Sequence, residues 1–89
     1  MDSVIQKKIV VKGKQGLHAR PAALFVQLAN KFDSQVTLEK DNEKVNGKSI
    51  MGILMLAAEK GAEITITVEG DDAQQALDAL EGLVTKEDE

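Results

Sequence analysis

Hydrophobic spacing in this 89-residue chain switches repeatedly between two periods, and the switching limits the folds that are open to it. Ile64, Ile66 and Val68 alternate with polar neighbours, which is typical of a strand with one buried face. Over 21–32, by contrast, apolar residues recur three and four positions apart, which predicts an amphipathic helix. A chain that mixes the two periods buries its apolar faces by packing helices against a sheet.

The predicted order of elements is strand, helix, strand, strand, short helix, strand, helix. The strands are centred on 9–11, 36–39, 44–46 and 64–68, and the helices cover 21–32, a short segment after 49, and 73–84. The loops are short, and alternating strands bury only one face. We therefore expect an α+β fold, an open-faced β-sandwich in which a four-stranded antiparallel sheet carries three helices on one face, and a single domain over 1–89.

Local chemistry marks several ends of these elements. Pro21 is expected in the first turn of its helix, where a missing N–H has no helical partner to lose. Ser49 precedes an apolar run and is a predicted N-cap, although Gly52 denies it the glutamate of a capping box. The run Gly70-Asp71-Asp72 is expected to stop the last strand and to offer a cap to the final helix.

The composition argues against several classes of protein. Without cysteine the chain has neither disulfides nor thiolate metal sites, which suits a reducing compartment. The longest apolar run, Ile53 to Ala58, is far short of the roughly 20 residues of a membrane span. The net charge is -4 and the only aromatic residues are Phe25 and Phe32, which speaks against a nucleic-acid module. We expect a cytoplasmic protein with no membrane insertion.

His18 is the only histidine, and it stands between a glycine-bearing loop and the first long helix. Unpaired N–H groups and the helix dipole favour an anion at a helix N-terminus, and Arg20 would add charge-assisted hydrogen bonds. Histidine side chains ordinarily have a pKa of about 6.5, so a neutral imidazole is a competent nucleophile near neutral pH. The position suits phosphate that is bound covalently as well as phosphate that is merely held.

Other interpretations of His18 compete with this one. It is equally compatible, from spacing alone, with a solvated loop histidine beside an ordinary surface arginine. A metal site is disfavoured, because the chain offers no second histidine, no cysteine and no acidic residue close to His18 in sequence. No nucleophile elbow links a serine to His18 as in a hydrolase. We expect neither a metal nor a cofactor.

Two segments resemble a known family. The run over 16–23 reads Gly-Leu-His-Ala-Arg-Pro-Ala-Ala, which resembles the active-site segment of HPr, the histidine-containing phosphocarrier of the phosphoenolpyruvate-dependent sugar phosphotransferase system. The run over 48–52 reads Lys-Ser-Ile-Met-Gly, which resembles the regulatory-serine segment of Gram-positive HPr proteins. The separation of the two segments and the order of elements are also similar to that family.

The resemblance implies a carrier rather than an enzyme. His18 would accept a phosphoryl group on Nδ1 from phosphorylated enzyme I and pass it to the IIA domain of a sugar permease, while Arg20 steadies the phosphate. The chain departs from the family at Gln15, where many members carry a smaller serine or asparagine, so the orientation of the imidazole is left open.

The second segment implies regulation and docking. By resemblance, Ser49 is phosphorylated by HPr kinase/phosphorylase, which slows transfer to His18 and promotes binding to a catabolite-control transcription factor. A phosphate on a helix N-cap preserves the fold and presents about -2 charge to partners. Ile50, Met51 and Leu54 are the candidate partner-binding residues, whereas Ile53 and Leu56 are expected to be buried.

Three alternatives stay open. A regulatory interaction module would resemble HPr relatives that keep the serine and have lost the histidine, and the presence of His18 argues against it. A small-molecule-binding regulatory domain can share this element order. A nitrogen-related carrier of the same fold is disfavoured only by the match around Ser49. We expect a monomer.

Overall fold

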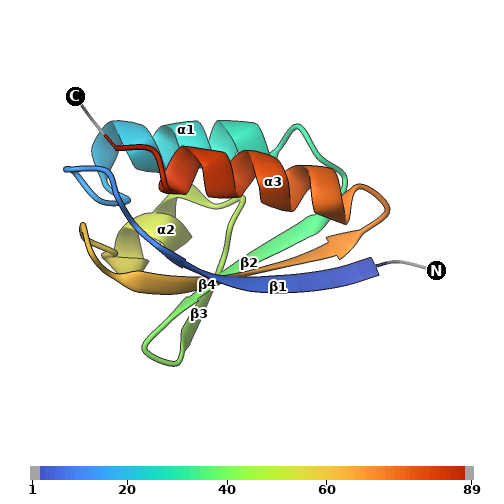
Figure 1. The fold of residues 1–89 in the computed structure, drawn as a ribbon, viewed down its shortest axis with the longest axis horizontal. Coiled ribbons are helices and arrows are strands. Elements are labelled where there is room, and N and C mark those ends of the chain that lie inside the picture. Colours follow the sequence, from blue (N-terminus) through green and yellow to red (C-terminus); the bar gives the residue numbers. More distant parts are fainter. Residues whose placement is uncertain (1–2, 88–89) are drawn as a thin grey trace.

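The computed structural model describes residues 3–87 and has a sheet covered by helices on one side only (Figure 1). Four antiparallel strands lie in the order β1-β4-β2-β3. The elements are β1 (Ser3–Val10), α1 (Ala19–Ala29), β2 (Gln35–Lys40), β3 (Glu43–Asn46), α2 (Ile50–Leu56), β4 (Glu63–Gly70) and α3 (Ala73–Val84). The predicted open-faced sandwich and the predicted element order are confirmed.

The sheet is held in alignment by apolar pairs on its covered face. Across the central pairings, Ile64 lies opposite Ile9 on β1, and Val68 lies opposite Val36 on β2. Ile64 and Val68 are fully buried, because successive strand residues point to opposite faces and these point toward the helices. The other face meets solvent, and on it the Gln6 side-chain amide donates to the Thr67 hydroxyl at 2.9 Å.

The hydrophobic core lies between the sheet and the three helices. From α1 it takes Ala22, Phe25 and Ala29, and Phe25 is fully buried. Burying a side chain of this size contributes on the order of 2–3 kcal/mol. The remaining core residues are Ile9, Val11, Leu17, Val36, Leu38, Ile53, Leu56, Ala58, Ile64, Ile66, Val68, Ala73, Ala76, Leu77, Leu80 and Val84. Within 3–87, every helix is too short or too polar to cross a bilayer.

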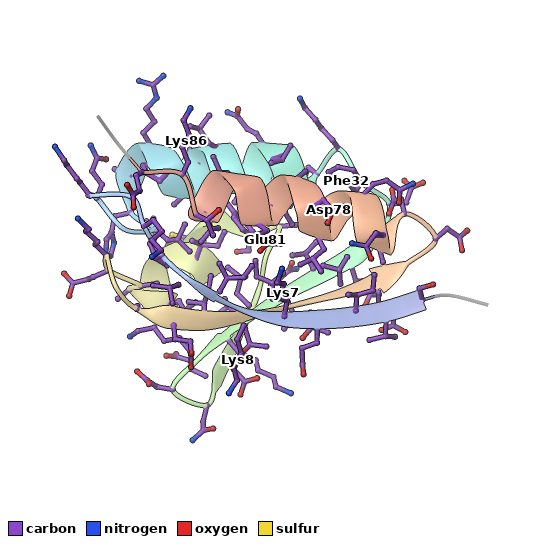
Figure 2. The ribbon with its side chains drawn as sticks, viewed as in Figure 1. Lys7, Lys8, Phe32, Asp78, Glu81 and Lys86 are labelled. Carbon is purple, nitrogen blue, oxygen red and sulfur yellow. The ribbon has the colours of Figure 1, made fainter. Side chains whose placement is uncertain are left out.

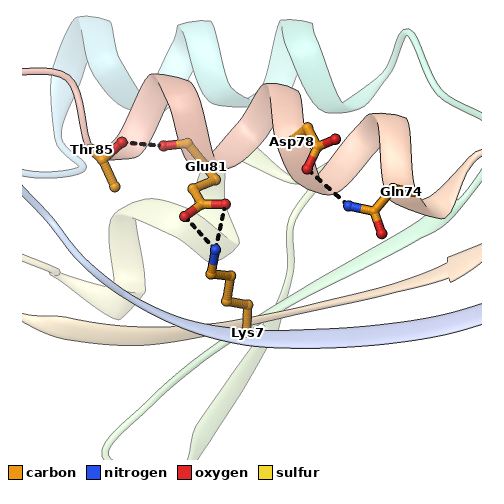
Figure 3. A network of polar contacts seen from close by, with 5 residues as sticks. All are labelled: Lys7, Gln74, Asp78, Glu81 and Thr85. Carbon is orange, nitrogen blue, oxygen red and sulfur yellow. Dashed lines mark hydrogen bonds and ion pairs between the residues drawn. The ribbon is translucent and has the colours of Figure 1, made fainter.

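Lys7 departs from the apolar alternation of β1. It lies opposite Ile66, on the covered side of the sheet, whereas its neighbour Lys8 points away from the helices (Figure 2). Because β1 is an edge strand, the ammonium of Lys7 reaches the rim and pairs with Glu81 of α3 at 2.7 Å (Figure 3). Glu81 also accepts a hydrogen bond from the Thr85 hydroxyl through its backbone carbonyl, at 2.7 Å.

The first strand and the first helix differ in extent from the predicted segments. The first strand, which the alternation around Ile9 located, extends back to Ser3, because the ion pair on Lys7 allows a charge on a covered position and so hides the alternation. The first helix ends at Ala29 rather than at 32. Both amide groups of Asn30, backbone and side chain, donate to the carbonyl of Val26, and the chain then closes with three-residue turns.

The predicted hairpin between β2 and β3 is confirmed. Lys40 pairs with Glu43, which leaves a two-residue loop. Asp41 and Asn42 in that loop have positive φ values of 52° and 69°. Positive φ at both positions is the signature of the type I′ turn, whose twist matches that of the two strands.

Candidate functional site

His18 occupies the N-cap of α1 with its imidazole unused by the helix. Its backbone is extended, with φ -121° and ψ 165°, and its side chain makes no capping hydrogen bond. Pro21, at the third helical position, has no N–H for a cap to accept, so its predicted place in the first turn is confirmed. The amides of Ala19 and Arg20 have no carbonyl within the helix to donate to. The half-buried His18 therefore stands next to two amides that lack a helical partner and two residues before the exposed Arg20.

The residue that follows His18 is in an unusual conformation. Ala19 has a φ of +45°, which lies in the left-handed region. For a residue with a Cβ this conformation costs on the order of 1–2 kcal/mol. The strain lies next to the candidate acceptor, as is common at sites that present a reactive group. Sequence patterns carry no signal for it.

The loop before His18 is anchored to the chain that follows α2. Gly16 has a φ of +66°, and a Cβ there would lie 2.4 Å from the carbonyl oxygen of Ala58. The N–H of Leu17 donates to that same oxygen at 2.7 Å, and the Leu17 side chain is buried. Glycine is thus required at 16, and the two contacts hold the chain on which His18 is presented.

A shallow groove runs beside Arg20, between the start of α1 and the end of α3. It has a volume of about 320 Å³ and is lined by Val11, Gly13, Gln15, Gly16, Leu17, Arg20, Pro21, Leu24, Leu83, Val84 and Lys86. The end of α3 is fixed there, because Lys12 N–H donates to the Val84 carbonyl at 3.1 Å. A larger hollow of about 640 Å³ lies on the open face of the sheet and contains no predicted site residue, so the smaller groove is the relevant one.

Ser49 occupies the N-cap of α2, as predicted. Its Oγ accepts the N–H of Gly52 at 3.1 Å, and its own N–H donates to the Asn46 carbonyl at 3.1 Å. Gly52 is packed closely, since a Cβ there would lie 3.2 Å from the Asn46 oxygen. The hydroxyl is partly buried and already serves the helix in the unmodified protein.

The two candidate sites lie toward opposite ends of α1. Leu17, just before His18, bonds to Ala58 beyond the end of α2, whereas Lys48, just before Ser49, donates from Nζ to the Phe32 carbonyl beyond the end of α1 at 2.7 Å. The 11 residues of α1 span about 16 Å at 1.5 Å per residue. His18 and Arg20 both lie at the start of α1, whereas the bond from Lys48 to Phe32 ties the chain before Ser49 to the end of α1.

An apolar stripe lines the exposed side of α2. No residue between Ile50 and Leu56 is polar or charged, and the helix buries only one side, through Ile53 and Leu56, whose predicted burial is confirmed. The stripe consists of Ile50, Met51, Leu54 and Met55, which are 38%, 62%, 37% and 66% exposed. Sequence reasoning missed Met55, although its position four residues after Met51 places both on one side of a helix.

Asp72 does not cap α3, contrary to the prediction. Its carboxylate instead accepts hydrogen bonds from the Ser34 hydroxyl, from the N–H of Asp33 at 2.9 Å and from the N–H of Ser34 at 3.0 Å. These bonds, that of the Ser34 hydroxyl first, hold the pKa of Asp72 below its ordinary value. This carboxylate ties the loop after α1 to the start of α3 and contacts neither His18 nor Ser49.

Known proteins resemble the chain over nearly its full length. The sequence profile of the PTS HPr component phosphorylation site matches residues 5–86. HPr-like protein Crh of Halalkalibacterium halodurans is 52% identical over 84 residues, which are 94% of this chain and 100% of that protein. Phosphocarrier protein HPr of Treponema pallidum is 48% identical over 80 residues, which are 90% and 91% of the two chains.

The fold agrees with these relatives. The crystal structure of a phosphocarrier protein HPr from Bacillus anthracis matches with a TM-score of 0.90 at 55% identity, covering 92% of this chain and 98% of that one. A family profile that spans most of the sequence and relatives at this level of identity lead to one conclusion: the chain belongs to the HPr family.

Proposed function

We propose that this chain is a cytoplasmic phosphocarrier, which accepts a phosphoryl group on Nδ1 of His18 from phosphorylated enzyme I and passes it to the IIA domains of sugar permeases. The observation that carries the proposal is the open N-terminus of α1, where the His18 side chain makes no capping bond. A group that the fold does not use is available for chemistry. The carrier acts as a monomer and catalyses no net reaction.

The transfer is a displacement at phosphorus. The lone pair of His18 Nδ1 attacks, the bond from phosphorus to the donor group of enzyme I breaks, and no water is consumed. The N–H groups of Ala19 and Arg20, which have no carbonyl partner within the helix, and the Arg20 guanidinium would donate hydrogen bonds to the phosphoryl oxygens. Because these contacts are few and exposed, the phosphoryl group is held weakly enough to be passed on.

The test is the intact mass after incubation with phosphoenolpyruvate, magnesium and enzyme I. The wild type is expected to gain one phosphoryl group that a brief acid treatment removes, because phosphohistidine is acid-labile. His18→Ala is expected to gain none. Ser49→Ala is the matched control at the other N-cap and is expected to be phosphorylated like the wild type. No gain by the wild type, with an enzyme I that phosphorylates another carrier, would refute the proposal.

We further propose that Ser49 is the target of HPr kinase/phosphorylase and that its phosphate inhibits through the docking surface. Ser49 lies toward the far end of α1 from His18, so direct repulsion between the two groups is screened by distance. The phosphate would place about -2 charge at the start of the apolar stripe. Enzyme I and the IIA domains would then meet a negative charge at the edge of the apolar stripe. A catabolite-control transcription factor would instead gain a charged group to bind.

The stripe on α2 is the proposed partner surface. A contiguous exposed apolar face on a helix without a polar residue is unusual for a solvated helix and typical of a docking site. Ile50, Met51 and Leu54 are retained as partner-binding residues, and Met55 is added because it is the most exposed of the four. A protein partner that approaches His18 from the side of α2 would contact this surface.

A second function is a regulatory interaction module without phosphoryl transfer. Relatives named HPr-like protein Crh favour it, and it would require only Ser49 and the stripe. The mass measurement separates the two, since a module would bind the transcription factor once Ser49 is phosphorylated and yet leave His18 unmodified in the presence of active enzyme I.

A further inference from the structure

Two thioethers stand on the exposed side of α2. Met51 and Met55 are four residues apart, so both side chains lie along the same side of the helix, and each is exposed over more than half of its surface. The chain contains three methionines, and the third, Met1, lies outside the described residues. Oxidation of methionine follows exposure, which makes these two sulfurs accessible to a dissolved oxidant.

The fold does not depend on either side chain. α2 is attached through Ile53 and Leu56, which are almost completely buried on its other side. Its start is closed by Ser49, and its end by Ala57, whose φ of 54° makes a left-handed cap with an N–H bonded to the Leu54 carbonyl. A change in polarity at 51 and 55 therefore alters the surface and leaves these attachments in place.

We propose that Met51 and Met55 form a reversible oxidation site, at which hydroperoxides convert the apolar stripe into a polar one and weaken docking. The proposal rests on the proposed function of the stripe. In each step a thioether sulfur attacks the distal oxygen of hydrogen peroxide, the O–O bond breaks, an S–O bond forms, and water leaves. The sulfur loses two electrons and the peroxide gains them. Methionine sulfoxide reductases reverse the step with thiol reductants, which are oxidised to a disulfide.

The effect follows from where the new oxygens lie. A sulfoxide oxygen is a strong hydrogen-bond acceptor, and burying it against an apolar partner removes its water without replacing it. Ile50 and Leu54 stand beside the two sulfurs in the stripe, so the oxygens would appear inside the proposed contact rather than at its edge. His18 is carried by α1 and is chemically unchanged.

The experiment compares the wild type with a Met51→Leu/Met55→Leu double variant, which keeps Met1. Each is treated with hydrogen peroxide, the oxidant is removed with catalase, and peptide masses assign the added oxygens. Phosphorylation by enzyme I is then measured against carrier concentration. Oxidation of the wild type is expected to raise the KM for the carrier about tenfold, as loss of a main interface contact does. The kcat, the melting temperature and the hydrolysis rate of phosphohistidine should stay unchanged.

The double variant separates the outcomes. Its KM before treatment serves as its own reference, because both substituted residues belong to the proposed partner surface, and peroxide is expected to leave that KM unchanged. A sulfoxide reductase should restore the KM of the oxidised wild type. If the oxidised wild type carries oxygens on both residues and keeps its KM, the inference is wrong. If the double variant loses activity as the wild type does, the damage lies elsewhere and the inference is again wrong. An untreated wild type that is never phosphorylated would instead refute the proposed function.

Discussion

The starts of α1 and α2 both have an extended N-cap residue, but the two N-cap side chains behave differently. His18 and Ser49 are both extended N-cap residues, with φ values of -121° and -112°. Ser49 closes its helix by accepting the Gly52 N–H, whereas His18 leaves its helix open, and Pro21 removes the N–H that a cap at 18 would normally accept. The difference teaches that an N-cap side chain can close its own helix or can leave the first amides of the helix available to a ligand.

The start of α3 shows a third use of the same position. The Asp72 carboxylate turns away from its own helix and bonds to Asp33 and Ser34 in the loop after α1. Of the three N-cap residues, Ser49 thus closes its helix, Asp72 makes a tertiary contact, and His18 is left as the candidate reactive residue. Breaking each one should produce a different combination of lost stability and lost transfer.

The largest effect is expected at the loop that presents His18. Gly16→Ala would force a Cβ against the Ala58 carbonyl at a φ of +66°, and should lower the free energy of unfolding by about 2–4 kcal/mol. Urea unfolding measures this. Gly82→Ala is the control, because a Cβ there meets nothing within 4 Å and should stabilise α3 by about 0.5–1 kcal/mol. Equal effects of the two substitutions would contradict the requirement for glycine at 16.

A charge on the stripe should separate docking from folding. Met51→Glu is expected to weaken binding to enzyme I about tenfold, because a carboxylate would be desolvated at the contact. Its melting temperature should barely change, since Met51 is exposed. Gln75→Glu adds the same charge on exposed α3 and should leave binding intact. Scanning calorimetry measures the melting temperature, and a binding titration measures the affinity for enzyme I. A large fall in the melting temperature of Met51→Glu would instead mean that this side chain belongs to the core.

The two caps should respond to alanine in opposite ways. Ser49→Ala is expected to lower the free energy of unfolding by about 1 kcal/mol through the lost bond to Gly52, with transfer retained. His18→Ala should cost less than about 0.5 kcal/mol, within the range of surface substitutions, and abolish transfer. Denaturant midpoints measure the stability of both variants, and phosphorylation assays measure their transfer. Equal losses of stability would mean that His18 caps α1 in solution.

The smallest effect is expected from the titration of Asp72. Its pKa is lowered in the folded protein, so its contribution is fully present above the ordinary value of about 3.8 and is lost as the pH falls through the lower folded value. The melting temperature of Asp72→Asn should therefore approach that of the wild type between pH 5 and pH 2. Asp78→Asn on the same helix controls for the loss of one charge. A gap that stays constant with pH would contradict the role of the Asp33 and Ser34 bonds.

Much of this fold could be predicted from hydrophobic spacing, because the covered face determines it. Alternation located β4, the three- and four-residue spacing located α1 and α3, and an apolar run after Ser49 located α2. What spacing could not show was the tertiary use of polar side chains. The charge of Lys7 concealed the alternation over the first half of β1, and Asn30 ended α1 earlier than predicted. The Asp72 carboxylate bonds to a loop 38 residues away in sequence rather than to its own helix. The partners of Lys7 and Asp72 are distant in sequence, whereas Asn30 bonds to Val26, four residues before it, a local use of the side chain that apolar spacing does not show.

The candidate site was predictable to the same extent. Residue types and their order pointed to His18 and Arg20, and an N-cap preference pointed to Ser49. The left-handed Ala19 and the contact of Gly16 with Ala58 are features that no local pattern specifies, whereas Met55 could have been found from its position four residues after Met51. The roles of the site residues in transfer and regulation stay predictions until phosphorylation is measured.

The ion pair between Lys7 and Glu81 also limits how the first strand can be mispaired during folding. A slip of two residues keeps the same face of β1 toward the helices, so apolar alternation alone does not oppose it. After such a slip Lys7 would lie opposite Ile64 or Val68, and its ammonium would lose Glu81. Because the Lys7 side chain is half exposed, the lost pair costs on the order of 1 kcal/mol or less. A single charge at the rim thus discriminates the native alignment from its nearest competitor, and it makes the edge a poor template for a foreign strand.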